Sequence, residues 1–299
     1  MSKSIGGVLK NKTTISMDEF FSLCDSGHYL IDEYGGDIEV LAKNLNLWRA
    51  GKPVIICFTA AIPKRKEKQY PFFSGIKFSE RAKLPLIAVA DPSIRRSLDL
   101  SLAWYAGSLE RPTLQNSLSD FVGKISFNSF SPPILFGGSG GGFAALAVKS
   151  LVSNTPCHAL VWNPQTSITE YNKKFVDSYI STCFLDGKSQ GKNVSAYEIL
   201  EANNIVHDLA SFPYKSNEMG GKVLYLQSKS DGFHVEHHLK KFIDVNFLSC
   251  CKDKSLNSQF EEYISSDKSI SVRLGPFSDG HSAPSEDMLL DNIKELIGE

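Results

Sequence analysis

A glycine-rich segment in the middle of the chain restricts the fold more than any other part of the sequence. It reads Ile134-Leu-Phe-Gly-Gly-Ser-Gly-Gly-Gly-Phe-Ala-Ala-Leu146, so Ser139 lies between an apolar, strand-like run and a small-residue, helix-like one. The spacing matches the G-x-S-x-G turn, which presents a serine on a sharp connection between a strand and a helix. Glycines at 137 and 141 let the two backbones approach closely. The segment therefore predicts that Ser139 is a nucleophile and that the N–H of Gly140 faces a developing oxyanion.

Two phosphate-binding loops are alternative interpretations of the same segment. A P-loop needs Lys followed by Ser or Thr after its last glycine, whereas Phe143 and Ala144 follow here. A dinucleotide site can be fitted loosely to Gly138 and Gly140. That site belongs on the first strand of its unit with an acidic residue about 20 positions on, and the next acidic residue here is Glu170. The serine nucleophile is favoured over both, and over a purely structural glycine loop.

Apolar runs of strand length alternate with longer segments of helical character, which is typical of βαβ units around a mostly parallel sheet. We expect strands at Pro53–Phe58, Leu84–Ala90, Pro132–Phe136, His158–Trp162, Lys222–Gln227 and Ser269–Leu274, and an additional edge strand at His28–Asp32. We expect helices at Ile38–Trp48, Ser93–Tyr105, Gly141–Leu151, Ile168–Ser181, His234–Phe247 and Ser285–Ile297. One α/β domain over residues 1–299 is expected, with N-terminal edge elements over 1–50 and a polar surface insertion or lid over 184–221.

A serine nucleophile needs a base, and the base needs an acid that orients it. In this architecture the acid and then the histidine follow the serine along the chain, each on a loop after a later strand. Asp231 comes shortly after the predicted strand that ends at Gln227, and His281 comes after the one that ends at Leu274. We therefore predict His281 as the base and Asp231 as the orienting acid.

Other residues compete for these two roles. Asp279 stands two residues before His281, and so short a spacing in one tight loop makes the contact with Nδ1 difficult. Three histidines follow Asp231 closely and are alternatives for the base: His234, His237 and His238. The last two are expected to be exposed on a helix. No matching carboxylate or cysteine cluster accompanies them, so we expect neither a metal nor a bound cofactor.

The second oxyanion donor is expected from the loop after the first of the central strands. This loop reads Thr59-Ala-Ala-Ile-Pro63, and either Ala60 or Thr59 would supply the N–H. Its small residues leave room for a substrate. The charged run Lys64-Arg-Lys-Glu-Lys68 follows, and it is either a solvated surface or a contact for an anionic substrate or donor.

Trp104 and Tyr105 are candidate substrate-binding residues. They are either a sugar-stacking surface or acyl-pocket wall near the serine, or residues of the core or its rim.

Composition excludes several classes of protein. Hydrophobic residues make up 42% and charged residues 22% of the 299 positions, as in an ordinary globular protein. The net charge of −1 gives no support for nucleic acid as a partner. No apolar run approaches the roughly 20 residues of a spanning helix, and the first residues lack the apolar core of a signal peptide. Six cysteines without a C-x-x-C pair are expected to be reduced, in a cytoplasmic protein.

The elbow at Gly137–Gly141, the late Asp231 and the Asp-Gly-His281 loop resemble the α/β-hydrolase superfamily over the chain from Pro53 onward. A second, shorter resemblance is to bacterial glycan-locus proteins, including sugar O-acetyltransferases of capsule and accessory-secretion systems. It is carried by Ala90-Asp-Pro92, by Ala103-Trp-Tyr-Ala-Gly107 and by the Gly-Gly-Ser-Gly-Gly-Gly elbow.

These resemblances imply acyl transfer through an acyl-enzyme on small, acetyl-sized esters, which a glycan would carry. Water as the acceptor gives an esterase, and a sugar hydroxyl gives an O-acyltransferase with acetyl-CoA as a candidate donor. The alternatives are a thioesterase or peptidase of the same fold, or a non-catalytic binding protein.

Overall fold

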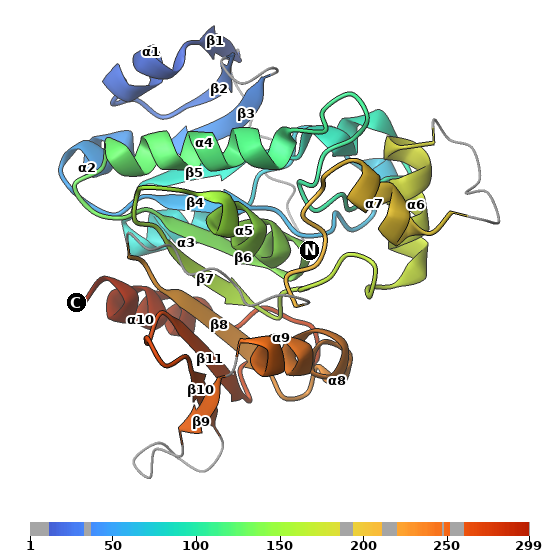
Figure 1. Ribbon diagram of the computed structural model, residues 1–299. Coiled ribbons are helices and arrows are strands. Elements are labelled where there is room, and N and C mark those ends of the chain that lie inside the picture. The colour runs from blue at the N-terminus through green and yellow to red at the C-terminus, as the bar shows by residue number, and fades with distance from the viewer. Residues whose placement is uncertain are drawn as a thin grey trace.

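The computed structural model describes residues 12–32, 37–185, 194–210, 220–246, 248–251 and 260–298. Its strands are β1 Thr13–Ile15, β2 Gly27–Ile31, β3 Ile38–Lys43, β4 Ile55–Phe58, β5 Leu86–Val89, β6 Ile134–Gly138, β7 His158–Trp162, β8 Val223–Ser228, β9 Ser249–Cys251, β10 Glu261–Ile264 and β11 Ile270–Gly275. They form one sheet in the order β1-β2-β3-β5-β4-β6-β7-β8-β11-β10-β9 (Figure 1). The six strands from β5 to β11 in this order pair in parallel, whereas β3 and β10 run antiparallel to both of their neighbours.

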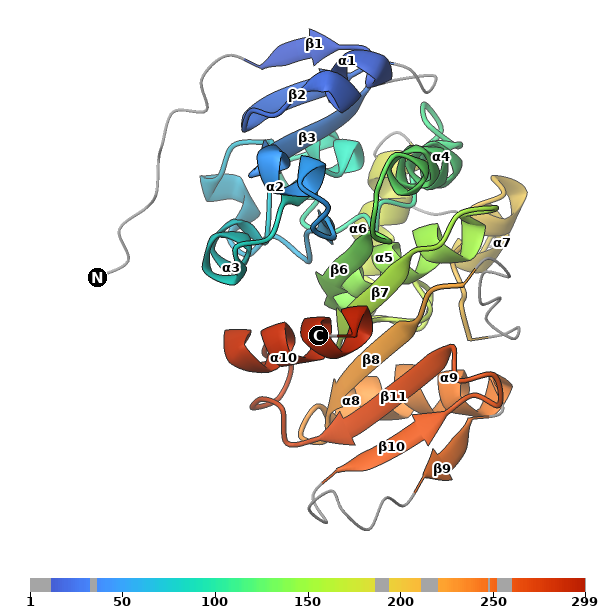
Figure 2. The ribbon, with the colours of Figure 1, turned by 90° about the vertical axis from the view of Figure 1, so that its left-hand side faces the viewer.

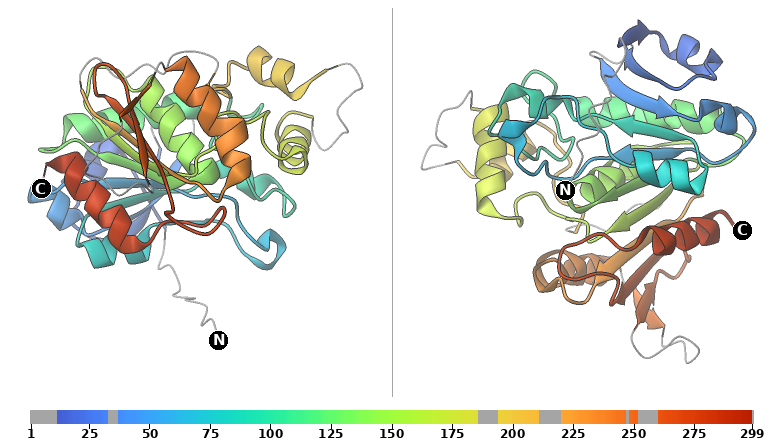
Figure 3. Two further views of the ribbon diagram at one scale, coloured as in Figure 1. Left: turned by 90° about the horizontal axis from the view of Figure 1, so that it is seen from below. Right: turned by 180° about the vertical axis from the view of Figure 1, so that it is seen from behind.

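Helices cover both faces of this sheet. They are α1 Met17–Ser22, α2 Leu45–Arg49, α3 Ile76–Ala82, α4 Leu114–Phe127, α5 Ser139–Leu151, α6 Lys173–Cys183, α7 Ala196–Ala202, α8 Gly232–His234, α9 Lys240–Val245 and α10 Glu286–Ile297. Helices α3 and α10 lie on one face, and α4, α5 and α9 lie on the other (Figure 2; seen from below in Figure 3). Helices α6 and α7 stand together beside the sheet (Figure 1).

Strand β4 shows why the sheet is covered on both faces. Its four residues are all buried, and they alternate between two cores. Ile55 and Cys57 pack in the core under α3 and α10, whereas Ile56 and Phe58 pack in the larger core under α4 and α5. A continuous apolar run is the expected pattern for a parallel strand that is buried on both sides.

The mixed α/β fold with a mostly parallel sheet is confirmed, as are the six predicted central strands. The predicted edge strand exists as β2, although β1 lies outside it. The elbow helix, the C-terminal helix and the helical segment after Asp231 are also confirmed; in the last, a π-helical turn over Val235–Leu239 joins α8 to α9. The predicted helix Ile168–Ser181 begins later, at Lys173.

Two predicted helices are wrong. Ile38–Lys43 is strand β3, because it pairs with both β2 and β5, and only the short α2 follows. In the segment 93–105, the 3₁₀ turn Pro92–Arg96 is the only helical part. The backbone there cannot continue as a helix, because Trp104 and Tyr105 have left-handed φ angles of 54° and 55°.

Several predictions on the remaining features are only partly addressed. The segment 184–221 contains α7, but 186–193 and 211–219 lie outside the described residues, so its role as a lid stays a prediction. Among the cysteines described in full, Cys57, Cys157 and Cys183 are buried, Cys24 is exposed, and all four are free thiols. No helix in the described ranges has the length and apolarity needed to cross a membrane.

Candidate functional site

Ser139 occupies the turn between β6 and α5, and the turn requires glycine on either side. The serine has φ of 53°, in the left-handed region that a residue with a side chain adopts at a cost. A Cβ atom at Gly141 would lie 2.4 Å from the carbonyl oxygen of Phe58, and one at Gly137 would lie 2.6 Å from the backbone of Gly141. Only glycine therefore allows α5 to pass this close to β4 and β6, which leaves Ser139 at the carboxyl end of the sheet.

The side chains of Ser139, His281 and Asp231 form a continuous chain of hydrogen bonds. The distance from Ser139 Oγ to His281 Nε2 is 2.8 Å, and the distance from His281 Nδ1 to Asp231 Oδ2 is 2.6 Å. Asp231 follows β8 and His281 follows β11, so loops after two further parallel strands bring both residues to the serine. Asp279 is exposed, and no ion pair or hydrogen bond joins its carboxylate to another described residue.

Asn163, at the end of β7, holds these loops in place. Its amide nitrogen donates to the carbonyl oxygen of Ser282 at 2.9 Å, and its amide oxygen accepts from the N–H of Ser228 at 2.8 Å. The hydroxyl of Ser228 also donates to the carbonyl oxygen of Ser278. The loop that carries His281 is thereby tied on both sides of the histidine to the ends of β7 and β8.

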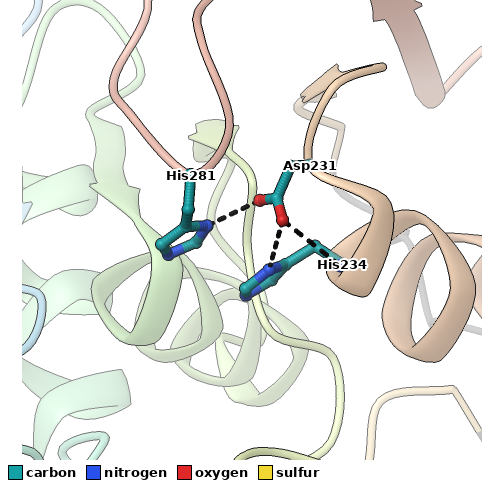
Figure 4. Close-up of side chains that lie close together, drawn as sticks. All are labelled: Asp231, His234 and His281. Atoms are coloured by element: carbon teal, nitrogen blue, oxygen red, sulfur yellow. Dashed lines mark hydrogen bonds and ion pairs between the residues drawn. The ribbon is translucent and has the colours of Figure 1, made fainter.

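A second histidine shares the Asp231 carboxylate (Figure 4). His234 Nδ1 lies 3.1 Å from Oδ1, the oxygen that His281 does not use. The imidazole rings of His234 and His281 are stacked, with centroids 4.0 Å apart and planes 13° apart. Burial would raise the pKa of the Asp231 carboxyl, but the hydrogen bonds from both histidines outweigh it and hold that pKa below its usual range. Burial lowers the pKa of His234, against the effect of its bond to Asp231.

The three histidines after Asp231 differ in their surroundings. His237 is exposed as expected, but His238 is fully buried, and the expectation that it is exposed is wrong. It is buried because the π-helical turn directs it inward, where its Nδ1 accepts from the N–H of Thr166. Burial lowers the pKa of His238 to about 3. None of the three contacts Ser139 among the described residues, whereas His281 does.

Asp231, His234 and His281 are also residue types that bind metal ions, and their ligand atoms lie within 4.8 Å of one another. The stacked rings direct their Nδ1 atoms to different oxygens of one carboxylate. This arrangement is that of two hydrogen bonds, in which both Nδ1 atoms are already engaged. The donor set therefore does not fit a metal without rearrangement.

Gln165 is a residue that the sequence prediction missed. Its side chain is fully buried, its amide nitrogen donates to Ser139 Oγ at 3.0 Å, and its amide oxygen accepts from the indole nitrogen of Trp104. The serine hydroxyl is thus held by Gln165 as well as by His281. The signal that could have found it is the polar sequence Asn163-Pro-Gln165 directly after the strand next to the elbow strand.

The structure corrects the prediction that Trp104 and Tyr105 bind substrate. Both side chains are only 1% exposed, so no ring face is open to a sugar. Trp104 instead positions Gln165. The Tyr105 hydroxyl accepts from the N–H of Thr59 at 2.8 Å and donates to the carbonyl oxygen of Val89 at 2.8 Å.

This contact separates the two candidates for the second oxyanion donor. The N–H of Thr59 is engaged by Tyr105, whereas no hydrogen bond within the described residues uses the N–H of Ala60. Gly140 is the second residue of α5, and its N–H has no partner within that helix. Gly140 and Ala60 are therefore the two donors that remain, and Thr59 positions the loop instead.

A cavity of about 470 Å³ opens beside Ser139, within the usual range for ligand sites. Its lining includes Ser139, His281 and Ala60 together with the aromatic side chains of Phe78, Phe136, Trp162 and Tyr171. Phe136 packs between Phe78 and Trp162, with ring centroids 5.0 and 4.8 Å away. Phe136 and Phe78 are buried at 2% and 7% exposure, so the partly buried Trp162 and Tyr171 are the aromatic side chains of this lining that are open to the cavity.

Comparisons with known proteins find similarity in structure alone. No family model matches the chain, and no curated protein sequence matches it. The capsule O-acetyltransferase of Neisseria meningitidis serogroup A superposes with a TM-score of 0.60 and 17% identity, over 93% of this chain and 97% of that one. The acetyl xylan esterase from Aspergillus awamori superposes with a TM-score of 0.52 and 12% identity, over 91% and 99%.

The acylaminoacyl peptidase from Pyrococcus horikoshii matches with a TM-score of 0.52 and 12% identity, over 92% of this chain but only 42% of its own length. At such identities the likeness concerns the fold alone. The neighbours share the mostly parallel sheet, flanked by helices, that the structure shows here. On this evidence the chain has the α/β-hydrolase fold.

Proposed function

We propose that the protein is a serine-dependent acyl-transfer enzyme, in which Ser139 is the nucleophile, His281 the general base and Asp231 the orienting acid. The observation that carries this proposal is the hydrogen-bond chain of 2.8 and 2.6 Å that ends on a serine in a left-handed turn. A strained serine at a strand-to-helix turn, with an imidazole and a carboxylate in line, is the geometry of nucleophilic acyl transfer.

In the first half of the reaction, Ser139 Oγ attacks the carbonyl carbon of an ester or thioester while His281 Nε2 takes the hydroxyl proton. The N–H groups of Gly140 and Ala60 hold the negative charge that develops on the carbonyl oxygen. His281 then returns the proton to the leaving oxygen or sulfur, and the acyl group stays on Ser139. In the second half, His281 deprotonates the acceptor hydroxyl, whose oxygen attacks the acyl carbon; the bond from that carbon to Ser139 Oγ then breaks as His281 returns the proton to Oγ.

An acetyl-sized acyl group on a glycan is the substrate class that we favour. Two neighbours that match over nearly their whole length are named for acetyl groups on polysaccharides, a capsule O-acetyltransferase and an acetyl xylan esterase. The partly buried rings of Trp162 and Tyr171 beside the serine supply flat apolar faces of the kind that stack on sugar rings. Water as acceptor makes the enzyme an esterase, and a sugar hydroxyl makes it an O-acyltransferase.

The nucleophile is tested with a fluorophosphonate probe and with p-nitrophenyl acetate. We expect the unmodified protein to react with both and Ser139→Ala to lose at least about a hundredfold in rate, because loss of the nucleophile removes covalent catalysis. Ser150→Ala, on the same helix, is the matched control, since its hydroxyl only bonds the carbonyl oxygen of Ala147. Labelling of Ser139→Ala at the normal rate, or no labelling of the unmodified protein, would contradict the proposal and favour a binding protein.

The substrate class is tested by the length of the acyl chain and by the acceptor. We expect p-nitrophenyl esters of two carbons to react faster than those of four, eight or twelve carbons. A maximum at eight carbons or more would exclude acetyl specificity. Release of p-nitrophenol that speeds up when a glycan acceptor is added, with the acetyl group found on that acceptor, indicates a transferase. A rate that no acceptor changes indicates an esterase.

A further inference from the structure

A second cavity adjoins the candidate active site and carries a different chemistry. It has a volume of about 770 Å³ and is lined by residues 61–67, by 98–102 and by the first turns of α6. Ala61 lines both this groove and the cavity beside Ser139. It directly follows Ala60, the proposed oxyanion donor. A ligand that extends past Ala61 would have one end at Ser139 and the other end in the groove.

The groove is positively charged although the chain as a whole is not. Its lining holds four basic and two acidic side chains, a net charge of +2, whereas the full chain has 32 basic and 33 acidic residues. The basic residues are Lys64, Arg65, Lys66 and Lys174. A concave surface with one dominant sign of charge concentrates ligands of the opposite sign.

The acidic residues do not neutralise this charge firmly. Lys64 pairs with Glu67 at 3.9 Å and Lys66 pairs with Asp99 at 2.6 Å, and the four side chains are between 68% and 75% exposed. Exposed pairs of this kind contribute little free energy, so a multivalent anion can replace the carboxylates. The ammonium group of Lys174 has no ion pair with any described residue.

A buried arginine gives the basic loop a fixed shape. Arg65 is only 6% exposed, and its guanidinium donates to the carbonyl oxygens of Lys68 at 2.8 Å and Ile94 at 3.1 Å. It also lies over the ring of Phe72, 4.9 Å from the ring centre. Because Arg65 joins this loop to the turn after β5, Lys64 and Lys66 stand on an anchored backbone beside the groove.

The groove also exposes apolar surface among the charges. Leu98 is 58% exposed, and Phe175 of α6 is only partly buried. A ligand that matches both features combines phosphate groups with a flat or apolar part. A nucleotide has this composition, as does a phosphorylated sugar carried on a nucleoside.

We propose that this groove binds the phosphorylated, nucleotide-like part of a substrate whose acyl group or acceptor hydroxyl lies at Ser139. The inference rests on the proposed acyl-transfer function and adds the substrate class: a phosphate ester with a nucleoside. Two sources share this chemistry, a nucleotide-bearing acyl thioester such as acetyl-CoA and a nucleotide-linked sugar acceptor. Two cavities that share Ala61, one of them beside Ser139, favour transfer between two bound molecules over hydrolysis.

Direct binding is measured by calorimetry on the Ser139→Ala protein, which keeps the groove but cannot turn over. The probes are ADP and inorganic pyrophosphate at low salt. We expect ADP to bind, and its affinity to fall as salt is added. We expect the double variant Lys64→Asn/Lys174→Gln to bind ADP at least about tenfold more weakly. Asn suits position 64 because Lys64 has a left-handed φ of 52°. The matched control is Lys173→Gln, the neighbouring exposed lysine, which pairs with Asp177 and does not line the groove.

Kinetic measurements on the same lysine variants, made in the protein that retains Ser139, distinguish the two sources of the nucleotide-like part. A rise in KM for acetyl-CoA with unchanged hydrolysis of p-nitrophenyl acetate assigns the groove to the donor. An unchanged KM for acetyl-CoA with a raised KM for a nucleotide-linked sugar assigns it to the acceptor. Equal ADP binding by the double variant and Lys173→Gln, or no ADP binding at all, overturns the groove proposal. In that case labelling of Ser139 by the fluorophosphonate still tests the acyl-transfer function separately.

Discussion

Two imidazole rings share the Asp231 carboxylate, one on each oxygen. The carboxylate is 6% exposed and is therefore held almost entirely by these donors and by the N–H of His234. Gln165 holds the serine hydroxyl from the other end of the same chain of contacts. At the residue scale, both ends of the hydrogen-bond chain are therefore held by a further side chain, Asp231 by His234 and Ser139 by Gln165.

The choice of the acid is tested by two substitutions. We expect Asp231→Asn to lower kcat by about 10³- to 10⁴-fold, because an amide no longer stabilises the protonated imidazole. Asp279→Asn should stay within about twofold of the unmodified enzyme, since that side chain is exposed. Rates of p-nitrophenyl acetate hydrolysis measure both. The reverse order of effects would show that Asp279 is the acid.

We expect His234 to hold the Asp231 carboxylate in position. Its hydrogen bond to Oδ1 also reduces the negative charge that the carboxylate presents to His281. Substitution by Phe keeps a ring against His281 but removes the hydrogen bond to Oδ1. We expect kcat/KM to fall by about tenfold, because the Asp231 carboxylate loses one of the side-chain hydrogen bonds that fix its orientation toward His281. His237→Phe, an exposed neighbour, is the control. A kcat/KM within about twofold of that of the control would contradict a positioning role for His234.

At the scale of elements, the segment from Asp91 to Tyr105 supports the oxyanion loop. Asp91 accepts from the N–H of Ser93 at 3.0 Å and from that of Tyr105 at 2.7 Å, and the Tyr105 hydroxyl then bridges Thr59 and Val89. This network replaces the helix that the sequence pattern indicated. It fixes the turn in which the N–H of Thr59 is engaged and the N–H of Ala60 has no hydrogen-bond partner among the described residues.

Tyr105→Phe removes this bridge without removing the ring. We expect the free energy of unfolding to fall by about 1–3 kcal/mol, because a buried N–H and a buried carbonyl lose their partner. We also expect kcat to fall more than KM changes, since in the proposed mechanism the N–H of Ala60, which would be displaced, acts on the oxyanion. Chemical denaturation and steady-state kinetics measure the two effects. Tyr197→Phe is the control, because Tyr197 is 51% exposed; equal effects of the two variants would refute the prediction.

At the scale of the whole molecule, buried histidines determine how stability depends on pH. Burial lowers the pKa of His158 to about 4 and that of His238 to about 3, and it also lowers the pKa of His234. In the unfolded chain these groups titrate near 6.5. Between about pH 6.5 and pH 4 the unfolded chain therefore binds more protons, and stability falls as the pH falls. Asp91 acts in the opposite direction, because burial raises its pKa to about 6.

The net effect is a loss of stability on acidification, since three histidines oppose one carboxyl. We expect the free energy of unfolding to decrease between pH 7.5 and pH 5.5, by at most about 1.4 kcal/mol per pH unit for each histidine. His238→Asn should reduce this slope, because the Asn oxygen can accept from Thr166 in place of Nδ1 but does not titrate. Denaturant titrations at three pH values measure the slope of the free energy of unfolding against pH. A slope that His238→Asn leaves unchanged, or stability that rises as the pH falls, would contradict this account.

Local patterns in the sequence were sufficient for the central strands, the elbow and the positions of Asp231 and His281. A parallel strand buried on both faces shows itself as an apolar run, and a glycine-flanked serine turn is set by its own backbone. Because parallel strands end at one edge of the sheet, residues just after β6, β8 and β11 must lie near one another. The meeting of Ser139, Asp231 and His281 thus follows from the order of elements along the chain.

The remaining features depend on partners that are distant in sequence. Ile38–Lys43 is a strand because β2 and β5 lie on either side of it, and Trp104 and Tyr105 are buried because Gln165 and Thr59 take their polar atoms. The stacking of His234 on His281 depends on which donors reach the Asp231 carboxylate in the folded protein. Likewise, the N–H of Thr59 is engaged and that of Ala60 is not, because the Tyr105 hydroxyl reaches only the former. No periodicity or motif encodes such a competition, because a hydrogen bond forms between groups that the tertiary structure has already brought together.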